Sequence, residues 1–165
     1  MEEYLGYRFI EMNDDELNNF YSGLYDFSFM NINEYALITH NGEIVDKICY
    51  QDTTWRRVRW PVIRDKNGNN ITARNEYQNL AIDLLQDPAT KVKLLRGVFG
   101  SGKDMLMTAM ALSLLEKQKF RKIVFIRPNV TVANVPDIGY LPGDTEEKLA
   151  WTLGPIMDKL VEKHN

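Results

Sequence analysis

The sequence predicts an α/β fold. A small β-rich N-terminal region is followed by a partial parallel sheet, and a glycine loop joins one of its strands to the next helix. A glycine-rich segment, "GVFGSGKD" at residues 97–104, lies between a short apolar run and a long run of helix-forming residues. A second apolar run follows, so strand, loop, helix and strand succeed one another within about 35 residues, as in a βαβ unit. Before residue 71, short apolar stretches separated by turn residues are typical of β-structure instead.

In the N-terminal region we expect a short strand at 7–12 and a helix that begins at Asn13 or Asp14 and stops at Gly23. The run at 34–50 predicts a hairpin, because its Asn41-Gly42 dipeptide tolerates the positive φ angles that a type I′ turn needs. Residues 53–63 predict a further strand. Pro61 within it favours a sheet edge or a strand end, since proline donates no ladder hydrogen bond. A polar turn follows at 64–70.

From residue 71 the pattern changes to alternating helix and strand. A helix is predicted over 74–88, with apolar residues at helical spacing and a stop at Asp87-Pro88, because proline cannot continue a helix. Residues 91–97 predict a strand that enters the glycine loop directly. Residues 103–118 predict the helix of that loop, and residues 121–128 the next strand, apolar enough to be buried on both faces.

Composition limits the possible classes of protein. A chain of 165 residues with 44% apolar residues can bury the core of an ordinary domain. The single cysteine, Cys49, excludes an internal disulfide framework, and two histidines are too few for a zinc cluster. No run approaches the ~20 apolar residues that a membrane span needs, and the first residues lack a secretory apolar segment. We therefore expect a cytoplasmic protein without membrane contact.

The glycine loop matches the first seven positions of G-x-x-x-x-G-K-[ST], a phosphate-binding motif. Main-chain N–H groups must point inward at a phosphate, which requires glycine at positions of unusual φ and a helix N-terminus directly after the loop. We expect Lys103 to bridge phosphates as a point charge. The alternative is an ordinary glycine turn with an unrelated lysine. The independent prediction of the preceding strand and the following helix favours phosphate binding.

Asp104 departs from the motif, which normally ends in Ser or Thr. A carboxylate is also a hard oxygen ligand, so Asp104 is a candidate ligand for Mg²⁺. At the first turn of a helix an aspartate is equally favourable to the helix dipole, whether or not a metal is bound. The sequence leaves these two roles open.

The segments "RNEYQNLAIDLLQDP", "GVFGSGKD" and "VFIRPNVTVANVPDIGYLPGDTEEKLAWTLGPIMDKL" resemble the PhoH family of P-loop ATPases, whose core is similar to the first RecA-like domain of superfamily I helicases. The resemblance covers about residues 72–162. It implies that residues 71–165 are the N-terminal part of a P-loop ATPase domain with a partial RecA-like parallel sheet. Residues 1–70 resemble the linker that joins the ATPase to a nuclease in PhoH-like proteins with an N-terminal PIN domain, although no PIN carboxylates are present.

The same resemblance implies a set of site residues and the cofactors ATP and Mg²⁺. Gln78 lies where related helicases read adenine, with a solvated helix glutamine as the alternative. Arg127 ends an expected strand, where it would contact nucleic acid or the γ-phosphate, or form a salt bridge instead. Lys103 and Asp104 are the catalytic candidates, and Asp104 the metal ligand. The residues expected to bind nucleotide are Gln78, Gly97, Gly100, Ser101, Gly102, Lys103, Asp104, Met105 and Arg127. The side chains of Met105, Met107 and Met110 are also expected to fill the core beside the loop helix.

The PhoH pattern continues with an apolar strand ending in Asp-Glu, the Walker B motif, which orders magnesium and the attacking water. No such run follows residue 127 in this sequence. We therefore expect either the N-terminal portion of a longer protein or a reduced relative that binds nucleotide and hardly hydrolyses it. ATP hydrolysis, possible coupling to RNA remodelling and assembly into a homo-oligomer are the expected functions. A nucleotide- or partner-binding module with little hydrolysis is the alternative.

The charge distribution marks one further candidate site. The net charge of −3 divides into −8 for residues 1–50 (ten acids, two bases), +4 for 51–75 (two acids, six bases) and +1 for the remainder (eleven acids, twelve bases). The segment "WRRVRW" combines aromatic residues with Arg56, Arg57 and Arg59, as in sites that stack on bases and neutralise phosphates. RNA or single-stranded nucleic acid is therefore a candidate partner of these arginines and Arg127. The alternative is internal pairing with the acidic first 50 residues.

Overall fold

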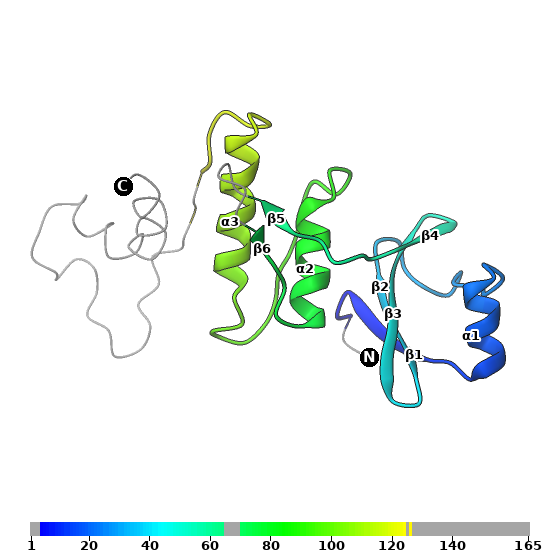
Figure 1. Cartoon of the computed structure of the whole chain (residues 1–165). Helices are drawn as coiled ribbons and strands as arrows, with labels where there is room; N and C mark the ends of the chain where they lie inside the picture. The colour runs from blue at the N-terminus through cyan, green and yellow to red at the C-terminus, as the bar shows by residue number, and fades with distance from the viewer. Residues whose placement is uncertain (1–3, 65–69, 125, 127–165) are drawn as a thin grey trace, which may run out of the picture.

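The computed structural model describes residues 4–64, 70–124 and 126 (Figure 1). The main sheet has the strand order β1-β2-β3-β4, with bounds β1 Tyr7–Glu11, β2 Tyr35–His40, β3 Glu43–Gln51 and β4 Thr54–Arg57. A second, two-stranded sheet consists of β5 Ile63–Arg64 and β6 Asn70–Ile71. The helices in the described ranges are α1 Asp14–Tyr21, α2 Glu76–Gln86 and α3 Lys103–Glu116.

The main sheet combines a crossover with a hairpin. Strands β1 and β2 are parallel, and α1 lies between them in the chain. Strands β2 and β3 form the antiparallel hairpin expected from the sequence, and Asn41 and Gly42 at its turn have φ angles of 52° and 79°. A register shift between Ile38 and Thr39 interrupts this pairing. Strand β4 extends the sheet by antiparallel pairing with β3.

Alternation along the strands gives the sheet two buried faces, and α1 and α2 cover opposite sides (Figure 1). On the α1 side, the core residues are Ile10, Met12, Phe20, Phe27, Met30, Ala36, Ile38 and Ile48. On the α2 side, the core residues are Tyr35, Leu37, Cys49, Val58 and Leu80. Successive residues of β2 thus alternate between the two cores. The sheet is consequently buried on both faces by segments far apart in the sequence.

Helix α2 contributes to two cores at once. Leu80 packs on the sheet, whereas Ile82 packs with Ile63, Leu106 and Met110 in a third cluster that includes α3. Figure 1 shows α2 beside α3, with β5 and β6 next to them. Asparagine side chains begin the first two helices: Asn13 forms a capping box with Glu16, and Asn75 accepts from the Gln78 amide. Helix α2 is therefore the element that connects the sheet to the glycine loop and its helix.

The predicted parallel sheet around the glycine loop is not formed by the described residues. Residues 91–97 and 121–124 carry no strand assignment, and the side chains of Val92 and Leu94 are 88% and 84% exposed. The sheet that is present is mostly antiparallel and is built from residues before 58. The physical reason is that a strand is stable only when paired, and a buried parallel strand needs neighbours on both edges and cover on both faces. Helix-forming segments need no such distant partner, and both predicted helices around the loop are present.

Parts of two sequence predictions fall outside the described residues: positions 65–69 of the predicted polar turn, and positions 125 and 127–128 of the predicted strand, which include Arg127. The part of the PhoH resemblance after residue 126, which includes "GYLPGD" at 139–144, also lies outside them. In the ranges that the structure describes, no helix is long and apolar enough to cross a membrane.

Candidate phosphate-binding site

The glycine loop forms a tight turn that leads directly into α3. Gly100 and Gly102 have φ angles of 78° and 88°, in the left-handed region that glycine adopts without steric cost. The Ser101 amide donates to the Val98 carbonyl at 3.3 Å, which closes the turn. Gly102 is the N-cap of α3, and no side chain caps this helix. The first amides of α3 consequently keep their capacity to bind an anion.

Two of the loop glycines also lie against other groups. A β-carbon at Gly97 would lie 3.2 Å from Ser101 Oγ, and one at Gly102 would lie 3.0 Å from Gln78 Nε2. Such distances leave no room for a side chain at Gly102 without movement of Gln78. The glycines of the motif therefore meet both a conformational and a steric requirement.

The Lys103 ammonium is folded over the loop. Its Nζ donates to the carbonyl oxygens of Gly97 and Val98, each at 2.8 Å, and to Ser101 Oγ at 3.1 Å. These partners all belong to the loop, so the positive charge is held against it. A polyphosphate offers the same ammonium stronger, charged acceptors in place of neutral carbonyls. The Lys103 ammonium could therefore bind an anion only by leaving one or more of these loop acceptors.

Asp104 lies exposed in the first turn of α3. The described residues contain no cluster of three or more His, Cys, Asp or Glu able to hold a metal ion. Mg²⁺ in nucleotide sites is ordinarily held by one or two protein oxygens together with phosphate oxygens and water. One carboxylate beside the phosphate loop fits that mode of binding, and does not fit a metal site formed by the protein alone.

Gln78 on α2 reaches the loop from the side. Its Nε2 donates to the Ser101 carbonyl at 3.0 Å, and its Oε1 accepts from the Arg74 amide at 2.9 Å. The main-chain N–H of Gln78 donates to Oδ1 of Asn75, the N-cap of α2, at 2.9 Å. The side chain is thus engaged at both ends. The sequence pattern gave no indication of the bond to Ser101, because the two residues are 23 positions apart.

The structure does not place the other two predicted nucleotide contacts, Met105 and Arg127, at the loop surface. The Met105 side chain packs against the cluster shared by α2 and α3, which includes Met110, as expected for core methionines, whereas Met107 is 39% exposed and does not fill the core as predicted. Arg127 lies outside the described residues. The structure therefore brings together Gln78, Gly97, Gly100, Ser101, Gly102, Lys103 and Asp104, a set that spans the loop, α2 and α3.

The arginines of the basic segment are mostly bound within the protein. Arg56 forms a two-pronged ion pair with Asp83 of α2, at 2.8 and 2.6 Å, and the Tyr35 hydroxyl also donates to Asp83 at 2.8 Å. The bond to Asp83 raises the pKa of Arg56, and burial raises the pKa of Tyr35 above its usual range. Arg57 pairs with Asp46 at 3.1 Å. Both arginines are thus paired internally, but only Arg57 pairs with the acidic first 50 residues as the alternative expected, whereas the partner of Arg56 lies on α2.

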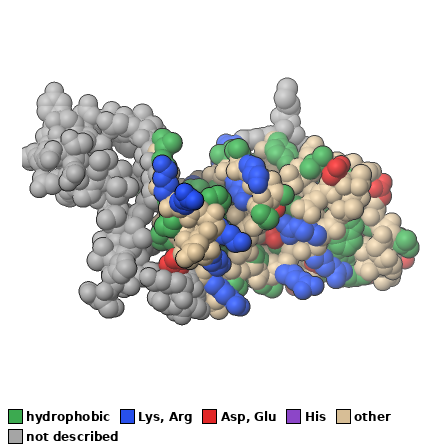
Figure 2. All heavy atoms as spheres, turned by 90° about the horizontal axis from the view of Figure 1, so that it is seen from above, with side chains coloured by type: hydrophobic (Ala, Val, Ile, Leu, Met, Phe, Trp, Pro, Cys, Tyr) green, Lys and Arg blue, Asp and Glu red, His purple; other side chains and the backbone are tan. Residues whose placement is uncertain are grey.

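Arg59 and Trp60 remain exposed after β4, with Trp60 66% exposed. The Lys47 ammonium lies 4.2 Å from the centroid of the Trp60 ring, a cation–π contact. Figure 2 shows Lys and Arg side chains spread over the face seen from above, with few acidic side chains among them. The exposed cationic and aromatic groups of this segment are therefore fewer than the sequence suggests.

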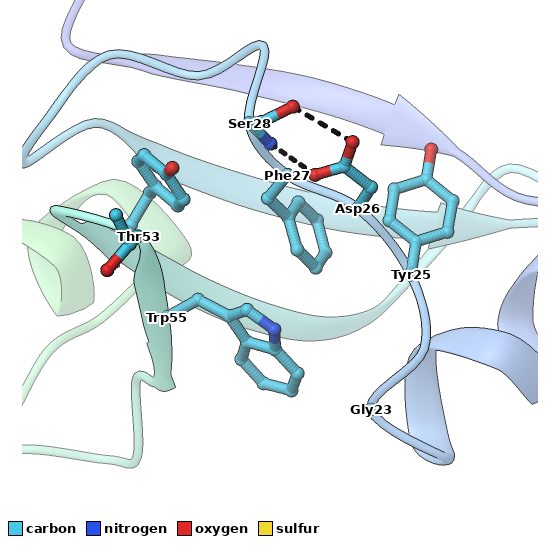
Figure 3. A pocket seen from close by; sticks show the side chains of 8 residues that line it. Gly23, Tyr25, Asp26, Phe27, Ser28, Thr53 and Trp55 are labelled. Atoms are coloured by element: carbon cyan, nitrogen blue, oxygen red, sulfur yellow. Dashed lines mark hydrogen bonds between the residues drawn. The ribbon is translucent and has the colours of Figure 1, made fainter.

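A hollow of about 320 Å³ lies in the N-terminal half, away from the loop (Figure 3). Its lining residues are Gly23, Tyr25, Asp26, Phe27, Ser28, Tyr50, Thr53 and Trp55. The Asp26 carboxylate accepts from the amide and hydroxyl of Ser28, at 2.8 and 2.9 Å, and these bonds lower the pKa of Asp26. Sequence reasoning did not single out this hollow, because its residues come from two separate stretches of the chain, 23–28 and 50–55.

A glycine loop with the spacing G-x-x-x-x-G-K that enters a helix is the arrangement typical of phosphate-binding-loop proteins. The profile of the family described as PhoH-like protein matches residues 70–164. This chain belongs to the PhoH-like protein family. A comparison with solved structures gives no significant match.

Curated relatives agree with this family. The chain is 31% identical to Protein PhoH2 of Bacillus subtilis over 170 residues, which cover 96% of the chain and 37% of that relative. It is 32% and 34% identical to Protein PhoH2 of Thermobispora bispora and of Mycolicibacterium smegmatis, each over 58% of the chain and 22% of the relative. The chain thus spans less than two fifths of the length of these relatives.

Proposed function

We propose that the protein binds a nucleoside triphosphate at the glycine loop and hydrolyses ATP. The observation that carries the proposal is the Lys103 ammonium, bonded to a glycine loop with left-handed Gly100 and Gly102 beside a helix N-terminus that no side chain caps. Membership of the PhoH-like family supports the same assignment, since it suggests an ATPase of the phosphate-binding-loop type.

In this mechanism the protein stabilises charge and supplies no covalent chemistry. The loop amides and the first amides of α3 hold the phosphates, and Lys103 leaves the Gly97 and Val98 carbonyls to bind phosphate oxygens. Asp104 would hold Mg²⁺, which neutralises phosphate charge when bound. A residue that orients the attacking water is not assigned, because the sequence has no apolar strand ending in Asp-Glu after the loop.

A Lys103→Ala variant tests the proposal. Removing a charged phosphate ligand is expected to weaken MgATP binding about tenfold or more and to abolish phosphate release. Isothermal titration with MgATP measures the first effect, and steady-state phosphate release measures the second. Binding by the parent without release supports the alternative, a nucleotide-binding module with little hydrolysis. Equal binding by parent and variant contradicts the proposal.

Nucleic acid is a second proposed ligand, on the exposed part of the basic segment. An exposed tryptophan next to an arginine can stack on a base and neutralise a phosphate, and Trp60 and Arg59 offer this pair. Replacing Trp60 with Ala is expected to weaken binding of a single-stranded RNA by about 1–3 kcal/mol. Arg57→Ala is the control, because Arg57 is paired with Asp46. Fluorescence anisotropy at two salt concentrations measures both, and equal losses would contradict this assignment.

Coupling of hydrolysis to RNA remodelling, assembly into a homo-oligomer and a cytoplasmic location stay predictions. A single thiol and the use of ATP favour the cytoplasm. Sedimentation velocity with and without MgATP tests the oligomer.

A further inference from the structure

The geometry points to Gln78 as the residue that positions the phosphate-binding loop, rather than one that reads the base of a nucleotide. This inference rests on the proposed nucleotide binding and assigns Gln78 a role at that site. As a positioning residue, Gln78 acts through the Ser101–Gly102 peptide and touches no phosphate itself.

The orientation of the Gln78 amide is fixed by its two partners. Oε1 accepts from the Arg74 amide, a group that can only donate, so Nε2 must face the loop. Nε2 donates to the Ser101 carbonyl, a group that can only accept. Each end of the side chain is thus bound to a main-chain group, and together the two bonds hold the amide plane of Gln78 against the loop.

The bond to Ser101 sets the direction of the next main-chain amide. The peptide that joins Ser101 and Gly102 is planar and trans, so its C=O and N–H point in opposite directions. Because Gln78 binds the carbonyl from the α2 side, the Gly102 N–H points away from α2. Gly102 has a φ angle of 88° and lies directly against Nε2, so the same contact constrains the residue that begins α3. Gln78 therefore fixes the peptide plane of a main-chain amide in the loop before any anion arrives.

Gln78 can perform this role because its own helix is held firmly. Its main-chain amide donates to the Asn75 cap, and Glu76 in the same turn forms an ion pair with Lys47 of β3, whose side chain is 8% exposed. Two turns further along α2 from Glu76, Asp83 binds Arg56 of β4. The N-terminal sheet thus fixes the helix that fixes the loop. A loop that is ordered in advance loses less conformational entropy when a ligand binds, which raises affinity.

Magnesium tripolyphosphate separates the two roles, because it contains the phosphates of ATP without a base. Isothermal titration of the full chain with magnesium tripolyphosphate, MgATP and MgGTP is compared for the parent and for Gln78→Ala. Loss of one positioning hydrogen bond is expected to weaken all three ligands by a common factor of about 3 to 10. Gln86→Ala is the matched control, because Gln86 donates to the Val62 carbonyl in the same manner at the other end of α2. This control should leave all three affinities unchanged.

A second variant, Gln78→Glu, adds a pH test. An ionised carboxylate has no proton for the Ser101 carbonyl and repels it, whereas the protonated carboxyl can donate. Gln78→Glu should therefore bind tripolyphosphate more weakly than Gln78→Ala at pH 8. The affinity of Gln78→Glu divided by that of Gln78→Ala should rise as the pH falls toward 5, because the protonated carboxyl regains a donor. A general loss of helix stability would not produce this rise.

Each outcome has a distinct meaning. Weaker ATP binding with unchanged tripolyphosphate binding would show that Gln78 reads the base, and would overturn the inference. Unchanged affinity for all three ligands would also overturn it, since the loop would then be ordered without Gln78. If the parent binds none of the three ligands, the proposed function itself fails and the inference falls with it.

Discussion

Gly102 is the position of the site where a side chain is least tolerated. Its φ angle of 88° is unfavourable for any residue with a side chain, and a β-carbon there would meet Gln78 Nε2 at 3.0 Å. The motif predicts a glycine at this position, because the spacing G-x-x-x-x-G-K requires one. The motif could not predict that the Gln78 side chain, from a different helix, also fills the space beside Gly102.

Replacing Gly102 with Ala should lower the free energy of unfolding by more than about 1 kcal/mol, because the backbone conformation and the contact both oppose the new methyl group. Gly23→Ala is the matched control. Gly23 has a similar φ angle of 75°, and a β-carbon there meets nothing within 4 Å. Urea unfolding measures both variants. Equal losses would mean that the contact with Gln78 contributes nothing.

The arginines at 56 and 57 show what residue types alone leave open. The sequence allows both nucleic-acid contact and internal pairing for them, and it does not show which acidic residue each arginine would bind. The structure pairs Arg56 with Asp83 across 27 positions of sequence, and no local pattern marks such a partner. Trp55 and Arg57 face α1, whereas Arg56 and Val58 face α2, as expected for alternate residues of a strand.

At the scale of elements, α2 acts as a brace between the sheet and the loop. Leu80 and Ile82 anchor it in two different cores, while Glu76 and Asp83 pair with basic residues of the sheet. The apolar spacing predicts this helix and its end at Asp87 correctly. Its two-sided burial follows only from the position of the sheet and α3.

An Asp83→Asn variant tests the brace. It leaves the Arg56 guanidinium without its carboxylate, and a half-buried pair of this kind should cost about 2 kcal/mol, less than a fully buried one because Arg56 is 35% exposed. Asp46→Asn removes the partner of Arg57, which is 47% exposed, and should cost under about 1 kcal/mol. Urea denaturation provides both values. A larger loss for Asp46→Asn would contradict the assigned role of α2.

For the whole molecule, the thiol buried between the sheet and α2 makes the free energy of unfolding fall as the pH becomes alkaline. Burial raises the pKa of the Cys49 thiol to about 11 from its ordinary value of 9.0. The folded state therefore keeps a proton that the unfolded state releases first. The stability that this proton provides is complete below about pH 9 and is lost as the pH rises toward 11.

The parent should consequently lose about 1 kcal/mol of unfolding free energy between pH 8 and pH 10 that a Cys49→Ala variant does not lose. The comparison removes contributions from Tyr35, whose pKa is also raised by burial, because both proteins share it. Urea unfolding at pH 8, 9 and 10 measures the difference. Parallel pH curves for the two proteins would show that the thiol does not titrate as its burial requires.

The sequence by itself determined the features that depend on neighbours in the chain. These are the glycine spacing and lysine of the loop, the helices on either side of it and the Asn41-Gly42 turn, because positive φ, capping and helix propensity act over a few residues. Only the tertiary structure decided the parallel pairing of β1 with β2, the bond from Gln78 to the loop and the internal pairing of Arg56. The strand predicted at 91–97 is absent for the same reason: its apolar pattern is local, but the hydrogen-bond partners that a strand needs lie elsewhere in the chain. Local energetics fix a helix or a turn, whereas strands and ion pairs depend on which distant segment arrives beside them.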